Sequence, residues 1–311
     1  MSALAGALES LFADALGIQA SERLVILGDD GTAETAELLY QGALGRGWDP
    51  VFLRIPPRQR HGEEPPAAVA AVLQATDVGI LATSFSLSHT AARRAATATG
   101  ARLASLPGVT LDMLGRTLNL DWEELRRSAA RVAALLAGQE ARLSSPAGTD
   151  LKLDLGGRPV WVDDGALKAP GAFGNLPAGE VFLAPRNAEG VAVLDGSLAG
   201  FGLLDQPVRL EIRAGRVVAT DFSPLWELLR PLLPAAAVVA ELGVGLNPRA
   251  LLTGHLLEDE KILGTVHLAL GDNSSFGGDN QVPLHLDGLI QRPTLTVDGR
   301  TILREGQPAW R

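Results

Sequence analysis

The sequence predicts a mixed fold, in which a small parallel α/β sheet domain precedes a mostly antiparallel, β-rich domain. Up to about residue 105, short β-rich runs alternate with alanine-rich amphipathic segments, which is typical of parallel α/β units. Beyond residue 140, short strands alternate with glycine-rich turns, which favours antiparallel pairing. The 311 residues suffice for two domains. We expect an α/β domain over 1–120, a connecting helix over 121–139 and a β-rich domain over 140–311.

The first domain should contain four parallel strands separated by helices. The strands are expected at 23–28, 50–55, 77–83 and 101–106. The helices are expected at 32–45, 66–75 and 89–99. Each helical segment is long enough for the crossover that a parallel strand pair requires. A small open sheet covered by helices follows from this order.

The connecting helix begins at Asp121, a plausible N-cap, and Gly138 ends its apolar stripe. For the second domain the sequence predicts strands joined by tight turns. Its clearest strands are 151–155, 180–185 and 207–212, followed by a turn and return strand over 213–218. One helix is expected at 223–232, with Ser223 as a cap and Pro224 at the first helical position.

Charge and cysteine content exclude several classes of function. The 27 Lys and Arg residues against 36 Asp and Glu give a net charge of -9, so a nucleic-acid partner is not expected. The chain has no cysteine, so a metal must be held by His, Asp and Glu. The first residues carry Glu9 and Asp14 and do not resemble a signal peptide, and no apolar stretch reaches membrane-spanning length. We therefore expect a cytoplasmic protein without a membrane partner.

Histidines gather near the C-terminal end of the sequence. Of the five in the chain, His255, His267 and His285 fall within 31 residues. His285 and Asp287 stand two apart in PLHLDGL, so on a strand both side chains leave the same face. His267 lies in an apolar run typical of a buried strand. These residues could hold a metal, although a buried histidine is more often simply hydrogen-bonded.

Three acidic residues add candidates for the same site. Glu180 directly precedes an apolar strand, and Glu241 follows the apolar run AAAVVA. An unpaired buried carboxylate is costly, and a divalent cation is one way to offset that cost. The alternative is that both lie at solvated strand ends. Glu260, in EDEK, is a candidate proton acceptor, although such a charged run is usually a solvated face.

Several motifs, in order, resemble those of the aminopeptidase T-type metallopeptidases (peptidase family M29). They are NLPAGEVFLAP at 175–185, ELGVGLNP at 241–248, DEKILGTVHLALGDNSSFGG at 259–278 and HLDGLI at 285–290. The resemblance implies a pair of divalent ions, a homodimer and short peptide substrates. It also implies the metal ligands Glu180, Glu241, His267, His285 and Asp287. The family has a tyrosine seven residues after the first of these histidines, where this chain has Ser274.

The resemblance predicts an aminopeptidase-like hydrolase that acts through a metal-activated water. Glu241 or Glu260 would accept the water's proton. Oxygen and nitrogen ligands suit zinc, cobalt or manganese and leave iron open.

Two other classes of protein stay open. His267, His285 and Asp287 also fit the two-histidine, one-carboxylate pattern of non-haem iron oxygenases. Ring-opening dioxygenases that act on dihydroxypyridines belong to the same broader superfamily. A non-catalytic metal-binding protein is the third possibility.

Overall fold

The computed structural model describes residues 3–310, which cluster into two compact units. Of these residues, unit 1 comprises 3–122 and 165–178, and unit 2 comprises 123–164 and 179–310. Unit 1 is built on a parallel sheet and unit 2 on antiparallel sheets, so the predicted fold class is confirmed. Residues 165–178, which the sequence-based division assigns to the second domain, cluster with unit 1.

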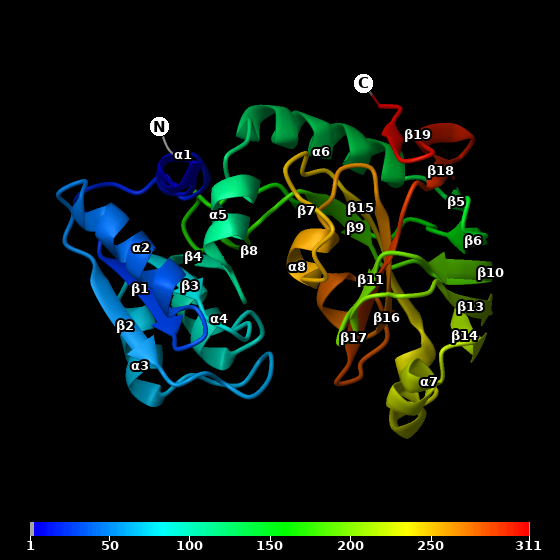
Figure 1. Ribbon diagram of the computed structural model, residues 1–311, viewed down its shortest axis with the longest axis horizontal. Helices are drawn as coiled ribbons and strands as arrows, with labels where there is room; N and C mark the ends of the chain where they lie inside the picture. The colour runs from blue at the N-terminus through cyan, green and yellow to red at the C-terminus, as the bar shows by residue number, and fades with distance from the viewer. Residues whose placement is uncertain (1–2, 311) are drawn as a thin grey trace. The chain divides into compact units, whose positions relative to one another are not determined.

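Unit 1 is a parallel sheet flanked by helices (Figure 1). Among the described residues its strands run in the order β2-β1-β3-β4-β8. Their bounds are Val51–Ile55, Leu24–Asp29, Val78–Ala82, Arg102–Ser105 and Phe173–Asn175. The helices are α1 (Ala3–Glu9) with its continuation Ser10–Ala15, α2 (Ala33–Leu44), α3 (Ala67–Gln74), α4 (Ala91–Ala98) and α5 (Leu111–Thr117).

The core of unit 1 forms because alternate residues of each strand face opposite sides of the sheet. On one face, Val25 and Leu27 of β1 pack with Val69 and Leu73 of α3. On the other face, Gly28 leaves room for α2, since a Cβ there would collide with Ala36. Helices therefore cover both faces, as parallel sheets require.

Unit 2 begins within α6 (Trp122–Leu136), at Glu123, and contains two antiparallel sheets. Within residues 3–310, the larger antiparallel sheet has the order β14-β13-β10-β6-β5-β18-β19-β20. Its strands are Arg216–Thr220, Val208–Arg213, Asn187–Leu194, Asp150–Asp154, Glu140–Ser144, Thr294–Val297, Arg300–Arg304 and Gln307–Pro308. Ala214 and Gly215 form the turn between β13 and β14, both with positive φ.

The smaller antiparallel sheet carries the residues of interest. For the described part of the chain its order is β12-β11-β17-β16-β15-β9-β7. The strands are Gly202–Leu203, Ser197–Leu198, His285–Ile290, Val266–Gly271, Val239–Gly245, Glu180–Leu183 and Trp161–Asp163. Helix α7 (Ser223–Leu229) and two 3-10 turns lead from β14 of the larger sheet to β15. Helix α8 (Leu256–Asp259) lies between β15 and β16, and a 3-10 turn lies between β16 and β17.

One helix differs in detail from its prediction. The segment expected over 223–232 divides into α7 and a 3-10 turn over Arg230–Leu232. Phe222 rather than Ser223 is the N-cap, and Pro224 lies in the first turn, where its missing N–H costs nothing. Over residues 3–310, no helix combines the length and the apolar character needed to cross a membrane.

Candidate metal centre

Four neighbouring strands of the smaller antiparallel sheet bring the five predicted ligands together. Glu180 starts β9, Glu241 lies in β15, His267 in β16, and His285 and Asp287 in β17. The register pairs Glu241 with Ala269 and Ala269 with Asp287. Because directly paired residues share a face, Glu241 and Asp287 lie in one row. His267 is paired with Gly243 in the adjacent row of that face.

Glycine makes room for the imidazole within this sheet. Gly243 lies opposite His267, and a Cβ at this position would overlap the Nε2 atom of the ring. Residues two apart on a strand face the same side of the sheet, so the Glu241 carboxylate and the space above Gly243 lie on the same face. His267 is completely buried there.

The side chains form two groups that share Glu241. In the first group, His267 Nε2 lies 3.2 Å from Glu241 Oε1 and 3.4 Å from Glu180 Oε2. In the second group, His285 Nε2 lies 3.4 Å from Glu241 Oε2 and 3.3 Å from Asp287 Oδ1. Within each group the potential ligand atoms lie within 4.8 Å of one another. Each group could therefore surround a single cation.

Lys261 was not among the predicted site residues, yet its side chain is fully buried beside the first group. Its Nζ lies 2.5 Å from Glu180 Oε1, 2.6 Å from Glu260 Oε1 and 3.7 Å from Asp163 Oδ2. Glu260 is therefore part of the cluster rather than of a solvated face. In the sequence Lys261 ends the charged run EDEK, a pattern that fits a solvated surface equally well.

The charges in the cluster stabilise one another. Burial would raise the pKa of Glu241, but hydrogen bonds with His267 and His285 outweigh burial and hold that pKa below its ordinary value. Burial also opposes ionisation of Asp287, yet the charge of His285 lowers its pKa to about 2. Burial would lower the pKa of His267, but Glu241 and Glu180 raise it to about 9. The acids thus favour a positive charge at the centre of the cluster.

Glu260 behaves differently from the other acids. Burial is the largest influence and, with the nearby charge of Glu180, raises the pKa of Glu260 to about 8 even though Lys261 opposes the shift. Burial would lower the pKa of Lys261, but the carboxylates of Glu180 and Glu260 raise it well above its ordinary value. The raised pKa of Glu260 favours its protonated form at neutral pH.

The cluster fits a divalent cation. With Glu260 protonated and both imidazoles neutral, four ionised acids and one ammonium leave three negative charges unbalanced; the acids are Asp163, Glu180, Glu241 and Asp287. Among the described residues, the buried Glu180 Oε2 accepts no hydrogen bond. Buried acids that retain unused oxygen atoms are the expected ligands of a divalent ion.

Two other predicted features lie outside these groups. The Ser274 hydroxyl donates to the carboxylate of its near neighbour Asp272, at 2.9 and 3.0 Å. His255 is the N-cap of α8, and it belongs to neither ligand group of the described chain.

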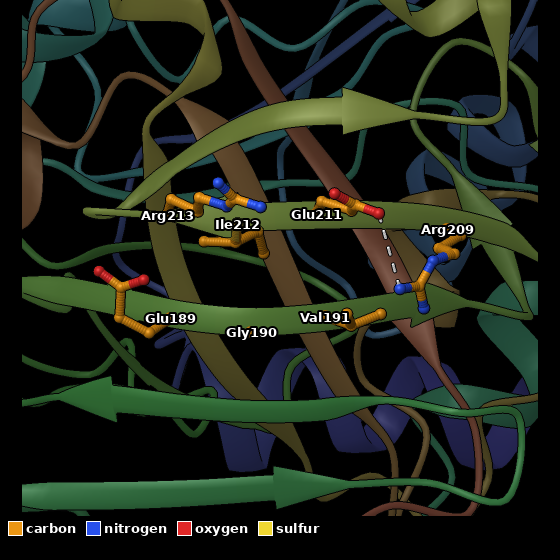
Figure 2. Close-up of a pocket in the computed structure, with 7 residues that line it drawn as sticks. All are labelled: Glu189, Gly190, Val191, Arg209, Glu211, Ile212 and Arg213. Atoms are coloured by element: carbon orange, nitrogen blue, oxygen red, sulfur yellow. Dashed lines mark ion pairs between the residues drawn. The ribbon is translucent and has the colours of Figure 1, made fainter.

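A pocket elsewhere in unit 2 lacks this chemistry. It lies on the larger antiparallel sheet, over β10 and β13 (Figure 2). It is lined by Glu189, Gly190, Val191, Arg209, Glu211, Ile212 and Arg213. Arg209 and Glu211 form a partly exposed ion pair at 3.8 Å. Without an imidazole or a group of converging acids, this surface is no candidate for the metal centre.

The fold and the site together define a class of protein: a two-unit α/β protein with a buried carboxylate and imidazole cluster suited to a divalent cation. The family of 2,5-dihydroxypyridine 5,6-dioxygenases (NicX) matches residues 17–309. The chain belongs to this family, which implies a divalent metal ion and a small-molecule substrate. No curated protein matches the chain.

Two solved structures share the fold. The 2,5-dihydroxypyridine dioxygenase from Pseudomonas putida KT2440 has a TM-score of 0.78 at 21% identity, over 99% of this chain and 98% of that chain. Wild-type AmpT from Thermus thermophilus has a TM-score of 0.71 at 18% identity, over 99% of each chain. At these identities, both similarities show the fold alone.

The predicted membership of the aminopeptidase T family is wrong, because the family match is to the dioxygenases. The predicted metalloprotease activity, an aminopeptidase-like hydrolase, is wrong for the same reason. The motifs that suggested it surround the ligand-bearing strands, and ligand types determine where a cation binds more than which reaction follows. The expectations of a peptide substrate and a homodimer came from that resemblance and lose their support with it.

Proposed function

We propose that this protein is an iron-dependent dioxygenase that cleaves the ring of a small dihydroxylated pyridine. The dioxygenase family match over residues 17–309 carries the proposal. The site's chemistry supports it, since a cluster of carboxylates and imidazoles without sulfur can hold ferrous iron. The substrate of the family, 2,5-dihydroxypyridine, is the first compound to test.

We place the iron in the second group, with Glu241, His285 and Asp287 as ligands. A third of the His285 side chain, 33%, is exposed, whereas His267 in the first group is fully buried. Substrate and oxygen must reach the reacting centre from solvent, so the group with an exposed ligand is the better candidate. Iron held by these three residues would supply the redox chemistry that a reaction with molecular oxygen needs.

The side chains around the group have separate roles in this proposal. Glu241 lies between the two imidazoles and directs one oxygen to each, so it acts as a ligand. Glu260, buried and with its raised pKa, holds a proton next to Lys261 rather than accepting one at neutral pH. Lys261 in turn fixes Glu180 through its Oε1 atom.

The first group, formed by Glu180, Glu241 and His267, supports the prediction of a second divalent ion. Glu241 places Oε1 beside the imidazole of this group and Oε2 beside that of the other, so one carboxylate could serve both groups. Elemental analysis of the purified protein would count the bound ions, and one ion per chain would limit binding to a single group.

Oxygen uptake tests the proposed reaction. The protein, loaded with ferrous iron under anaerobic conditions, is mixed with 2,5-dihydroxypyridine and oxygen while ring absorbance is recorded. We expect consumption of oxygen in step with loss of the aromatic absorption, and loss of both in His285→Ala and Asp287→Asn. An iron-loaded protein that leaves the ring intact, or one that instead hydrolyses an amino-acid amide, would refute the proposal.

A further inference from the structure

The loop between β16 and β17, residues 272–284, determines which nitrogen of His285 is free. His285 Nδ1 lies 2.8 Å from the backbone carbonyl oxygen of Asp272. A carbonyl oxygen can only accept a hydrogen bond, so Nδ1 carries the hydrogen and donates it. The Nε2 atom, which lies toward Glu241 and Asp287, is then the nitrogen available to a metal.

Phe276 of the same loop fixes the plane of the His285 ring. The two rings meet edge to face, with centroids 5.9 Å apart and an angle of 87° between their planes. Phe182 of β9 packs against Phe276 in the same manner, at 5.5 Å and 77°. Phe276 is only 9% exposed. The His285 imidazole therefore packs against an aromatic pair, one member of which, Phe182, belongs to the sheet.

The loop holds its shape through bonds that do not involve His285. Asn273 N donates to Asn280 O at 3.0 Å, and Asn280 N donates to Asn273 Oδ1 at 2.8 Å. The Asn280 side-chain amide donates to the carbonyls of Gly271 and Ala235, at 2.6 and 2.9 Å. Gly277 takes the positive φ of 94° that the turn needs. Asp272 and Phe276 are thus in place before any ligand binds.

The two imidazoles of the cluster differ in whether Nδ1 has a hydrogen-bond partner. Within the described chain, the buried Nδ1 of His267 has no hydrogen-bond partner. Histidines that bind metals almost always donate their second ring N–H to a carbonyl, a carboxylate or water, which sets the tautomer and the ring orientation. His285 has that partner.

We propose that Phe276 and Asn280 are positioning residues that hold His285 in the tautomer and ring plane needed for metal binding. The proposal rests on the iron site put forward above. Phe276 acts on the ring directly, and Asn280 acts through the loop that presents the Asp272 carbonyl. Neither side chain needs to touch the metal or the substrate.

Binding of Co²⁺ to the full-length protein tests the proposal. Its apparent Kd is measured by competition with a chromophoric chelator, together with the visible absorption bands of bound Co²⁺. We expect Phe276→Leu and Asn280→Ala to weaken binding about 10- to 100-fold, the usual effect of removing a partner of a metal ligand. The absorption bands should change in both. Phe276→Tyr, which keeps the ring, should bind as tightly as the wild-type protein.

A matched control separates positioning from packing. Phe222 forms an edge-to-face pair with Phe201 in the same unit, at 5.2 Å and 74°. Phe222→Leu should lower the melting temperature about as much as Phe276→Leu does, yet leave the Kd and the absorption bands unchanged. Equal loss of Co²⁺ affinity in both leucine variants would overturn the proposal, because general destabilisation would then explain the effect.

The same titrations distinguish failure of this inference from failure of the proposed iron site. If His285→Ala binds as many Co²⁺ ions per chain as the wild-type protein, and as tightly, the iron site is wrong and the inference falls with it. If His285→Ala loses Co²⁺ while Phe276→Leu and Asn280→Ala bind normally, the iron site stands. The positioning role alone would then be overturned.

Discussion

At the scale of single residues, the sequence identified both imidazoles and four of the five acids of the cluster, but missed Asp163 and the counter-ion Lys261. Glu180, Glu241 and Asp287 are each costly to bury alone, and that cost was visible from their apolar neighbours. Lys261 could not be recognised as a buried residue from the sequence, because a lysine in an acidic run also fits a solvated surface. Only the fold shows that β9 and the end of α8 bring it against Glu180.

Replacing Lys261 by Met should strongly destabilise the protein. The ammonium is the buried partner of Glu180 and Glu260, and removing one member of a buried ion pair typically costs about 3–5 kcal/mol. Added Co²⁺ should restore part of this loss, since a divalent cation also offsets the acids. Urea unfolding with and without Co²⁺ measures both effects.

Lys152 provides the control for this prediction. It pairs with Glu140 at 2.6 Å, but its side chain is 55% exposed. Lys152→Met should cost no more than about 1 kcal/mol, as exposed ion pairs do. Equal losses of unfolding free energy in the two variants would mean that Lys261 is not the essential counter-ion of the cluster.

Gly243 should be sensitive to a single added methyl group. In Gly243→Ala the new Cβ would collide with His267 Nε2, so the ring must move away from Glu241. We expect less divalent metal bound per chain and a stability loss of about 1–3 kcal/mol from overpacking. Metal content and melting temperature are measured together.

Gly79→Ala in β3 is the comparison for this glycine. Its Cβ would meet the Leu103 side chain in the core of unit 1, far from any ligand in sequence and in a different sheet. It should reduce stability and leave metal content unchanged. If Gly243→Ala retains full metal content, the space that this glycine provides is not needed for binding.

At the scale of helices and strands, local pattern predicted most of unit 1. The strand expected at 23–28 is Leu24–Asp29, and the strand expected at 101–106 is Arg102–Ser105. What the pattern could not show is β8, three residues long, which returns from the second half of the chain to pair with β4. So short a strand has no periodicity of its own, and its partner is set by tertiary structure.

An ion pair ties β4 to the segment that precedes β1. Arg102 meets Glu22 through two hydrogen bonds, of 2.7 and 2.8 Å, and also donates to the Leu16 carbonyl. The hydrogen bond from Arg102 lowers the pKa of Glu22. A lowered pKa means that the pair stabilises the fold above the ordinary glutamate pKa, and that this stabilisation is lost as the pH falls through the lowered value.

We therefore expect Glu22→Gln to reduce the free energy of unfolding at pH 7 by about 1–2 kcal/mol, the range for a partly exposed charged hydrogen bond. The difference from the wild-type protein should shrink as the pH is lowered to about 3, where the unfolded glutamate is protonated. Urea unfolding across this pH range measures it. A difference that grows in acid would contradict the role assigned to the ion pair.

At the scale of the whole molecule, the order of motifs did not determine the reaction. The chain shares its fold both with a structure named as a dihydroxypyridine dioxygenase and with AmpT. The types and order of the ligands predicted a metal site in this part of the chain. Which bond is broken depends on the metal bound and on how a substrate lies beside it. The spacing of ligands in the sequence predicts neither.

The location of iron is the most direct test. Crystals of the iron-loaded protein, measured at the iron absorption edge, would show the metal by its anomalous scattering. We predict a peak between His285 Nε2, Asp287 and Glu241, with the Asp272 carbonyl still bound to Nδ1 of the ring. Iron bound away from these side chains, or held in the buried group of Glu180 and His267 alone, would contradict the assignment.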